Sequence, residues 1–193
     1  MPILYLGLDP SRYPRKVFHY PVIRTVLIER LDVSNVDFAT HFLFTSRSAV
    51  KHWCHRFSVK GEVLAIGAAT AAALREQGIE AKVAPSATQE GVIELLETME
   101  LTHAYLFWPR STLARPVIEE YLTRKKVPFC ALDLYETKEQ KLEPVPDLDD
   151  FDEIVFTSPT TVQAFLKIFG TLPANKKLTP IGPVTAECLQ RSV

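Results

Sequence analysis

The sequence predicts two α/β domains, each built on a parallel sheet, and three observations carry this prediction. An apolar strand that ends in Thr-Ser and leads into a helix occurs at 44–50 and returns 112 positions later, at 156–162. A second motif, an apolar strand that ends at glycine and leads into a helix, occurs at 66–71 and again at 181–186. Apolar runs also alternate with helical patterns along the chain, which is typical of parallel pairing.

The composition indicates an ordinary soluble globular protein, with 47% hydrophobic and 23% charged residues among 193. The formal net charge of −1 offers no basic field, so we expect neither nucleic acid nor a membrane surface as a partner. No apolar run reaches the roughly 18 residues that a membrane helix needs, and the start of the chain does not resemble a signal peptide. Cys54, Cys130 and Cys188 form no CxxC pair, which favours reduced thiols, no metal site and a cytoplasmic location.

Short apolar runs at 3–8 and 17–22 predict two strands with too few residues between them for a crossover helix. An extended segment follows at 22–28. Five further strands are expected to end near Phe44, Ile66, Val83, Phe107 and Leu134. Helical patterns separate them at 47–57, 68–77, 89–99 and 113–125. Residues 135–150 are rich in acidic residues and proline, which indicates a linker or exposed loop.

The simplest assembly of these elements is discontinuous. Residues 24–138 form one continuous, five-stranded α/β domain, and residues 1–23 combine with 139–193 to form the other. The second copy of the repeat is followed by too few residues for the strand and helix that follow the first copy. We therefore expect the discontinuous domain to be truncated, lacking its first helix and its last strand and helix.

The repeat places hydroxyls and glycines at helix N-termini, where the free N–H groups suit carboxylate or phosphate. In open α/β sheets, ligands bind at this edge. Plain helix capping without any ligand is the alternative for each copy taken singly. The candidate ligand-binding residues at helix starts are Thr45, Ser46, Gly67, Thr70, Thr88, Ser158, Gly182 and Thr185.

Three further kinds of side chain are candidates for a site. Tyr135 follows the fifth strand of the continuous domain, where a phenol can donate a proton to a leaving hydroxide; an ordinary half-buried aromatic is an equally good interpretation. Arg110 follows the preceding strand and is a candidate carboxylate ligand, whereas Arg115 is more simply a solvated arginine at a helix start. His52 and His55 are expected to face solvent, because the buried stripe of their helix lies elsewhere.

Six stretches of the sequence, taken in their order along the chain, carry a resemblance to a known family: 44–50, 66–74, 85–91, 134–137, 151–159 and 181–186. This ordered set resembles the uroporphyrinogen-III synthase family. The resemblance implies two flavodoxin-like domains joined by a two-stranded linker, an active site in the cleft between them, and no metal or organic cofactor. It implies that Tyr135 is the catalytic tyrosine and that the hydroxyls of Ser46, Thr70, Ser158 and Thr185 line the site.

The implied reaction is the cyclisation of hydroxymethylbilane, a linear tetrapyrrole, to uroporphyrinogen III. In this reaction water is lost and the last pyrrole ring is inverted. We expect the protein to act as a monomer. One rival hypothesis is a non-catalytic two-domain module that binds a polycarboxylate or a phosphorylated small molecule at the same helix starts. A second rival is a flavin- or nucleotide-binding domain, against which the absence of a phosphate loop after Leu6-Gly7 argues.

Overall fold

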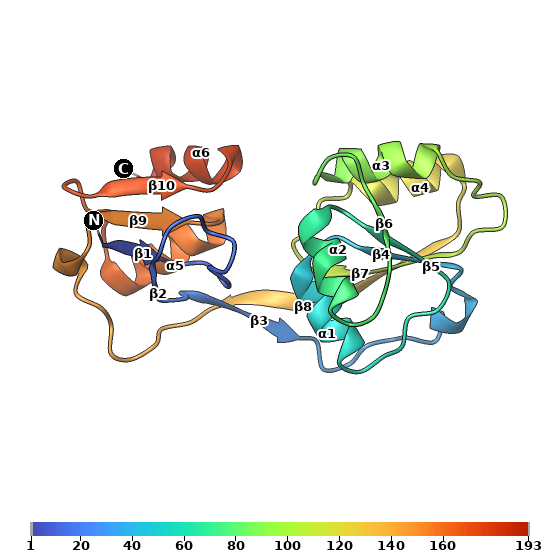
Figure 1. Cartoon of the computed structure of the whole chain (residues 1–193), viewed down its shortest axis with the longest axis horizontal. Helices are drawn as coiled ribbons and strands as arrows, with labels where there is room; N and C mark the ends of the chain where they lie inside the picture. Colours follow the sequence, from blue (N-terminus) through green and yellow to red (C-terminus); the bar gives the residue numbers. More distant parts are fainter. Residues whose placement is uncertain (1, 193) are drawn as a thin grey trace. The chain divides into compact units, whose positions relative to one another are not determined.

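The computed structural model describes residues 2–192, and their contacts divide into two compact units (Figure 1). Unit 1 comprises the residues up to Thr25 and from Thr137 on, and unit 2 is Val26–Glu136. The division falls within β3 (Ile23–Leu27) and β8 (Phe129–Glu139), which are neighbours in one sheet. The boundaries predicted for the two domains, 1–23 with 139–193 and 24–138, stay a prediction.

Unit 2 is a doubly wound α/β structure. Its sheet has the order β3-β8-β7-β4-β5-β6, and the pairs from β8 to β6 are parallel. Side chains of α1 and α2 share one buried cluster with Phe42 and Phe44, while those of α3 and α4 share another with Leu43 and Leu64. Helices therefore cover both faces of the sheet, as predicted. The further elements are η1 (Val36–Phe38), β4 (His41–Phe44), α1 (Arg47–Cys54), β5 (Glu62–Ala65), α2 (Ala68–Arg75), β6 (Lys82–Val83), α3 (Gln89–Glu97), β7 (Leu106–Ser111) and α4 (Val117–Lys125).

Several boundaries in unit 2 differ from the prediction. Strand β7 ends at Ser111 rather than near Phe107, and α1 ends at Cys54 rather than at residue 57. Helix α4 begins at Val117 rather than near residue 113, because a residue that precedes proline, here Arg115, is disfavoured in helical conformation. Strand β8 is predicted to end near Leu134, but it continues to Glu139. The extension has a partner in β3, its neighbour in the sheet, which a local pattern does not reveal. Tyr135 consequently lies inside a strand rather than beyond its end.

Unit 1 has the sheet order β10-β9-β1-β2, with every neighbouring pair parallel. Helices α5 and α6 pack with Leu4 and Phe156 on one face of this sheet. On the other face, Tyr5 and Val155 are covered by Tyr13 and Val17 of the segment between β1 and β2, which contains no helix, as predicted. The elements are β1 (Ile3–Tyr5), β2 (Phe18–His19), η2 (Leu148–Asp150), β9 (Glu153–Phe156), α5 (Pro159–Phe169), β10 (Lys177–Pro180) and α6 (Pro183–Arg191).

The repeat seen in the sequence is also a repeat of core packing. Trp53 of α1 is fully buried, with its ring centroid 4.5 Å from that of Phe57. Phe165 holds the same place in α5, also fully buried and 4.5 Å from Phe169. Each pair is spaced four residues apart; Phe169 is the last residue of α5, whereas Phe57 lies three residues beyond the end of α1. The first helix of each copy is thus anchored by an aromatic pair.

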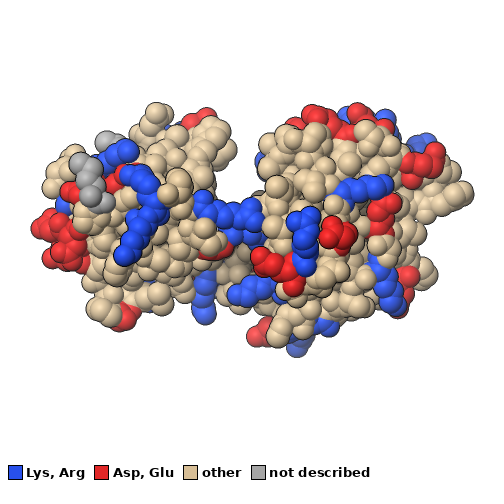
Figure 2. Space-filling view, in the orientation of Figure 1, with Lys and Arg blue, Asp and Glu red and all other residues tan. Residues whose placement is uncertain are grey.

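The surface carries charges of both signs. Acidic and basic side chains are interspersed on the visible face of each unit (Figure 2), in keeping with the net charge of −1. Across residues 2–192, none of the helices has the length and apolar character that crossing a membrane requires.

Candidate active site

A pocket of about 330 Å³ lies within unit 2, at the edge where the parallel strands end and the helices begin. Ligand sites in open α/β sheets occupy this edge. Four of the residues predicted for the site line the pocket, and three further polar residues, Gln89, Ser111 and Arg115, join them. The polar lining used below is Thr45, Ser46, Thr88, Ser111, Arg115 and Tyr135.

The first wall of the pocket is the start of α1. Ser46 is the N-cap, with extended backbone (φ −162°, ψ 154°), and its Oγ accepts a hydrogen bond from the Ala49 N–H at 3.0 Å. The neighbouring Thr45 Oγ1 accepts a hydrogen bond from Trp108 Nε1 at 3.0 Å. Both hydroxyls are therefore held by donors from the protein, and each retains its own O–H for donation.

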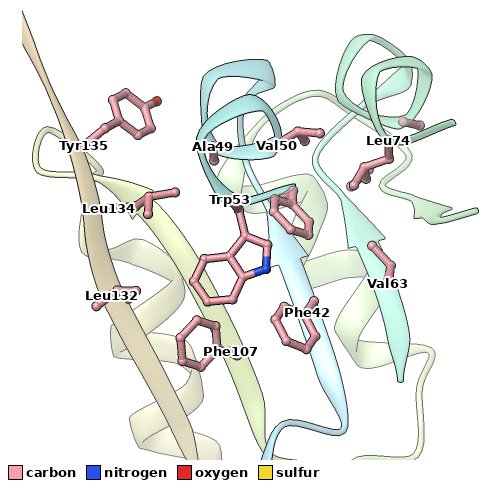
Figure 3. Close-up of a cluster of buried hydrophobic side chains, with 13 residues drawn as sticks. Phe42, Ala49, Val50, Trp53, Val63, Leu74, Phe107, Leu132, Leu134 and Tyr135 are labelled. Carbon is pink, nitrogen blue, oxygen red and sulfur yellow. The ribbon is translucent and has the colours of Figure 1, made fainter. Parts of the chain in front are cut away.

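Tyr135 brings its phenol to this helix start through a β-bulge. Arg110 pairs with Asp133, but the next residue of β7, Ser111, pairs with Tyr135, so Leu134 is the extra residue. The extra residue shifts the alternation of side chains along β8 by one position. Leu134 and Tyr135 therefore both face the cluster beneath α1 (Figure 3). The Tyr135 hydroxyl then lies 2.8 Å from Ser46 Oγ, while the residue as a whole is only 6% exposed.

The second wall is the segment that leads into α3. Thr88 is the N-cap of this helix and accepts a hydrogen bond from the Gly91 N–H at 3.0 Å. Its hydroxyl also lies 3.0 Å from Ser86 Oγ. A Cβ on Gly91 would collide with the Ser86 carbonyl oxygen, so glycine is needed for the segment to pass this close to the helix.

The two candidate arginines differ in their relation to the pocket. Arg110 does not line the pocket; its guanidinium binds Glu119 at 2.5 Å and Asp133 at 2.8 Å and lies over the Trp108 ring, with its side chain only 15% exposed. Arg115 has a side chain that is 56% exposed, as expected of a solvated arginine, but it also lines the pocket and donates two hydrogen bonds to Glu90, at 2.8 and 3.0 Å. These bonds lower the pKa of Glu90 to about 2.

The expectation that His52 faces solvent is wrong. Its ring packs against the ring of Tyr135, with centroids 5.4 Å apart and planes inclined by 31°. Burial lowers the pKa of His52, and the neighbouring cations Lys51 and Arg56 lower it further. His55, by contrast, is exposed, as expected. No group of three His, Cys, Asp or Glu side chains suited to a metal occurs within residues 2–192.

The remaining unit 2 candidates lie at the start of α2, outside the lining of this pocket. Gly67 is the N-cap of the helix, and a Cβ there would lie 2.8 Å from the Ala87 Cβ. Thr70, in the first turn, is buried at 3% exposed. Gly67 therefore permits close approach of the 84–88 segment, which forms the pocket wall at Ala87.

Unit 1 carries its own pair of helix starts. Ser158 caps α5 in a capping box with Thr161, and Gly182 caps α6 in a left-handed conformation with φ 96°. The helices follow β9 and β10, which are paired and parallel, so both helix starts lie at the same edge of the sheet. Thr185 lies in the first turn of α6 and is 3% exposed. Ser158, Gly182 and Thr185 thus share the carboxyl edge of one sheet.

A sequence profile of the family described as uroporphyrinogen-III synthase HemD matches residues 11–192. The chain belongs to the uroporphyrinogen-III synthase family. A protein of Methanothermobacter thermautotrophicus, provisionally described as a uroporphyrinogen-III synthase, is 27% identical over 170 residues, with 77% of this chain and 67% of that protein covered.

Two solved structures share the fold. The uroporphyrinogen-III synthetase of Helicobacter pylori 26695 superposes with a TM-score of 0.67 at 18% identity, covering 98% of this chain and 87% of that one. A mutant uroporphyrinogen III synthase of the extremely thermophilic bacterium Thermus thermophilus gives a TM-score of 0.59 at 17% identity, with 98% and 88% covered. At these identities the likeness concerns the fold, and it agrees with the α/β architecture predicted from the sequence.

The sequence motifs did not point to His52, which contacts Tyr135, or to Ser111, which lines the pocket, and they favoured Arg110 over Arg115. Ser111 comes directly after Arg110 at the end of β7, and Arg115 lies four residues further on, so position along the chain did not show which of them lines the pocket. His52 was misplaced because helix α1 packs under Tyr135 on a flank that is only partly buried. The sequence of this helix gives no signal that one of its histidines meets an aromatic ring from another element.

Proposed function

We propose that the protein is a uroporphyrinogen-III synthase that converts the linear tetrapyrrole hydroxymethylbilane to uroporphyrinogen III, losing water and inverting the last pyrrole ring. The observation that carries the proposal is the contact of 2.8 Å between the Tyr135 hydroxyl and the capping hydroxyl of Ser46, in a pocket of a chain that belongs to this family. A phenol held at a helix N-terminus is suited to assist the departure of a hydroxyl group.

The proposed chemistry starts with proton donation. Tyr135 gives its phenolic proton to the oxygen of the hydroxymethyl group. The C–O bond then breaks, water leaves, and the substrate becomes a cationic azafulvene. Ser46 donates its O–H to the phenolate, while its own oxygen accepts the Ala49 N–H. The partial positive charge at the start of α1 stabilises the negative phenolate. The proton released when the macrocycle closes restores the phenol, so Tyr135 ends the cycle unchanged.

Carboxylate binding is proposed for the helix starts. The substrate carries eight carboxylates, and a helix N-terminus offers free N–H groups together with a partial positive charge. Arg115 replaces Arg110 in this proposal, because Arg115 lines the pocket with its side chain 56% exposed, whereas Arg110 lies outside the lining with its side chain only 15% exposed. The proposed substrate ligands are Thr45, Ser46, Gly67, Thr70, Thr88 and Arg115 in unit 2, and Ser158, Gly182 and Thr185 in unit 1.

A non-catalytic binding module would use the same helix starts but would have no need for a buried phenol beside a capping serine. Family membership favours the enzyme over this alternative. We further propose that the enzyme acts as a monomer in the cytoplasm, without nucleic acid. The free thiols of Cys54, Cys130 and Cys188 suit a reducing compartment.

The test is incubation of the purified protein with hydroxymethylbilane, followed by separation of the type I and type III isomers. We expect the type III isomer to predominate, because simple closure without ring inversion gives type I. Formation of type I alone, at the rate seen in buffer, would refute the assignment. The Tyr135→Phe variant is the matched control, since it removes one oxygen and keeps the ring.

A further inference from the structure

We propose that His52 is a positioning residue for Tyr135, whose imidazole packs against the phenol ring and holds the hydroxyl at Ser46. The inference rests on the proposed function, in which Tyr135 donates the proton. It adds a residue that acts through Tyr135 rather than on the substrate. The supporting contact joins the two ring centroids at 5.4 Å with an interplanar angle of 31°.

Helix α1 holds the phenol at two points. At its N-cap, Ser46 lies 2.8 Å from the Tyr135 hydroxyl, and further along the helix His52 lies against the ring. The hydrogen bond fixes the position of the oxygen but not the plane of the ring. The flanking imidazole restricts rotation of the ring within its buried site, so the two contacts together define both the direction and the plane of the phenol.

The backbone at Tyr135 increases the need for such support. The residue follows directly on a β-bulge, where the ladder between β7 and β8 loses its regular register. Bulges redirect side chains and locally disrupt pairing. The placement of the hydroxyl therefore depends on side-chain contacts from α1 more than it would in a regular strand.

The imidazole presents a neutral ring to the phenol. Burial lowers the pKa of His52, and Lys51 and Arg56 act in the same direction. At neutral pH the contact is accordingly an aromatic one, in a partly buried position where an uncharged ring packs at little cost.

The internal repeat indicates that helix packing alone does not require a histidine here. Ser46 and Ser158 hold equivalent N-cap positions, so His52 corresponds to Ala164 of α5. Ala164 is fully buried in the core of unit 1 and supports the same kind of helix. The histidine occurs in the copy whose capping serine meets a tyrosine, which is the arrangement that a positioning role predicts.

The test compares kcat, KM and the type III fraction for four variants with those of the parent protein. His52→Ala introduces the residue found in the other copy, and His52→Phe keeps a ring without imidazole chemistry. His52→Leu keeps apolar bulk without a ring, and His55→Ala removes the exposed histidine from the end of the same helix.

We expect His52→Ala to lower kcat by about tenfold to a hundredfold with KM changed less than about twofold, because small misplacements of a catalytic group have effects of this size. His52→Phe should restore most of kcat, His52→Leu should lie between, and His55→Ala should match the parent. Parental kcat in His52→Ala would overturn the inference, and so would equal loss in His52→Phe and His52→Ala. Should His52→Ala fail to fold, His52→Phe is compared with His52→Leu instead. A higher kcat in His52→Phe supports the inference, and equal kcat values overturn it.

The outcomes separate the two proposals. If kcat is lowered in Tyr135→Phe but equals that of the parent protein in His52→Ala, the positioning role is refuted and the proposed function stands. Absence of type III product from the parent protein refutes the proposed function itself.

Discussion

The two copies of the repeat start with the same helix cap and put it to different uses. Ser46 and Ser158 have nearly identical backbone angles, φ −162° and ψ 154° against φ −163° and ψ 163°, and each accepts a hydrogen bond from the third residue of its helix. Ser158 completes a local capping box with Thr161. Ser46 instead meets Tyr135, 89 residues away. A structural cap becomes part of a candidate site when another element supplies a second functional group.

The copies also diverge at their second helix start. In unit 2, Gly67 is extended (φ 179°) and packs under Ala87 of the segment that follows β6. In unit 1, Gly182 has φ 96°, and a Cβ there would meet nothing within 4 Å. The flanking Ile181 and Val184 are 45% and 66% exposed. The segment after β6 thus walls the pocket of unit 2, while the start of α6 is open within unit 1.

The largest effect should come from removing the phenol oxygen. We expect Tyr135→Phe to lower kcat by about 10²- to 10⁴-fold, the usual range for the loss of one general acid, with some type III product remaining. Tyr20→Phe is the matched control in unit 1, since its buried hydroxyl donates only to the Leu142 carbonyl at 2.7 Å. Steady-state kinetics with resolved isomers make the comparison. An unchanged kcat in Tyr135→Phe would remove it as the proton donor.

Acid should affect unit 1 through Glu153. This carboxylate is 3% exposed, and the hydrogen bond from Arg15 is the main cause that lowers its pKa to about 2, with Thr179 and Lys177 assisting. Because the folded-state pKa lies below the usual 4.5, the stabilisation is present above pH 4.5 and is lost as the pH falls toward 2. The loss should amount to about 2 to 3 kcal/mol of unfolding free energy.

The Glu153→Gln variant tests whether the loss of stability at low pH comes from this carboxylate of unit 1. His41 holds the equivalent place in unit 2, and burial lowers its pKa below 6.5, so its contribution is lost as the pH falls below 6.5. Urea unfolding measured from about pH 7 to about pH 2 should show Glu153→Gln flattening only the lower part of the profile. A variant profile parallel to that of the parent below pH 4.5 would contradict the assignment to Glu153.

The two capping serines offer the most direct comparison. Ser46→Ala and Ser158→Ala should each lower the unfolding free energy by about 1 kcal/mol, because an equivalent cap is lost. Their kinetic effects should differ, since Ser46→Ala removes the hydroxyl beside Tyr135 and lowers kcat, whereas Ser158→Ala raises KM. Thermal unfolding and steady-state kinetics on both variants test this. Equal effects on kcat would show that the two caps have the same role.

The smallest expected effects concern the two glycines. Gly182→Ala should lower the free energy of unfolding by about 1 kcal/mol, because an alanine is strained at φ 96°. A Cβ at this position would meet no atom within 4 Å, so no steric clash is expected. Gly67→Ala should leave the backbone unstrained but push Ala87, a pocket residue, and so raise KM. Unfolding curves and KM values separate the two cases. A larger KM change in Gly182→Ala than in Gly67→Ala would reverse the comparison.

Short-range features were determined by the sequence itself. The alternation of strands and helices, the capping role of Ser46 and Ser158, and the missing helix between β1 and β2 all follow from residues close together in the chain. N-caps can be predicted in this way because a serine side chain bonds the backbone only three residues on. The ordered motifs were also enough to identify the family, which the match over residues 11–192 shows.

Only the tertiary structure decided how the site is assembled. The bulge at Leu134 depends on the pairing of β8 with β7, and without it Tyr135 would face away from Ser46. The contact of His52 with Tyr135 joins residues from a helix and a strand far apart in the chain. Register and packing between distant segments set these positions, and no local pattern of hydrophobicity carries that information.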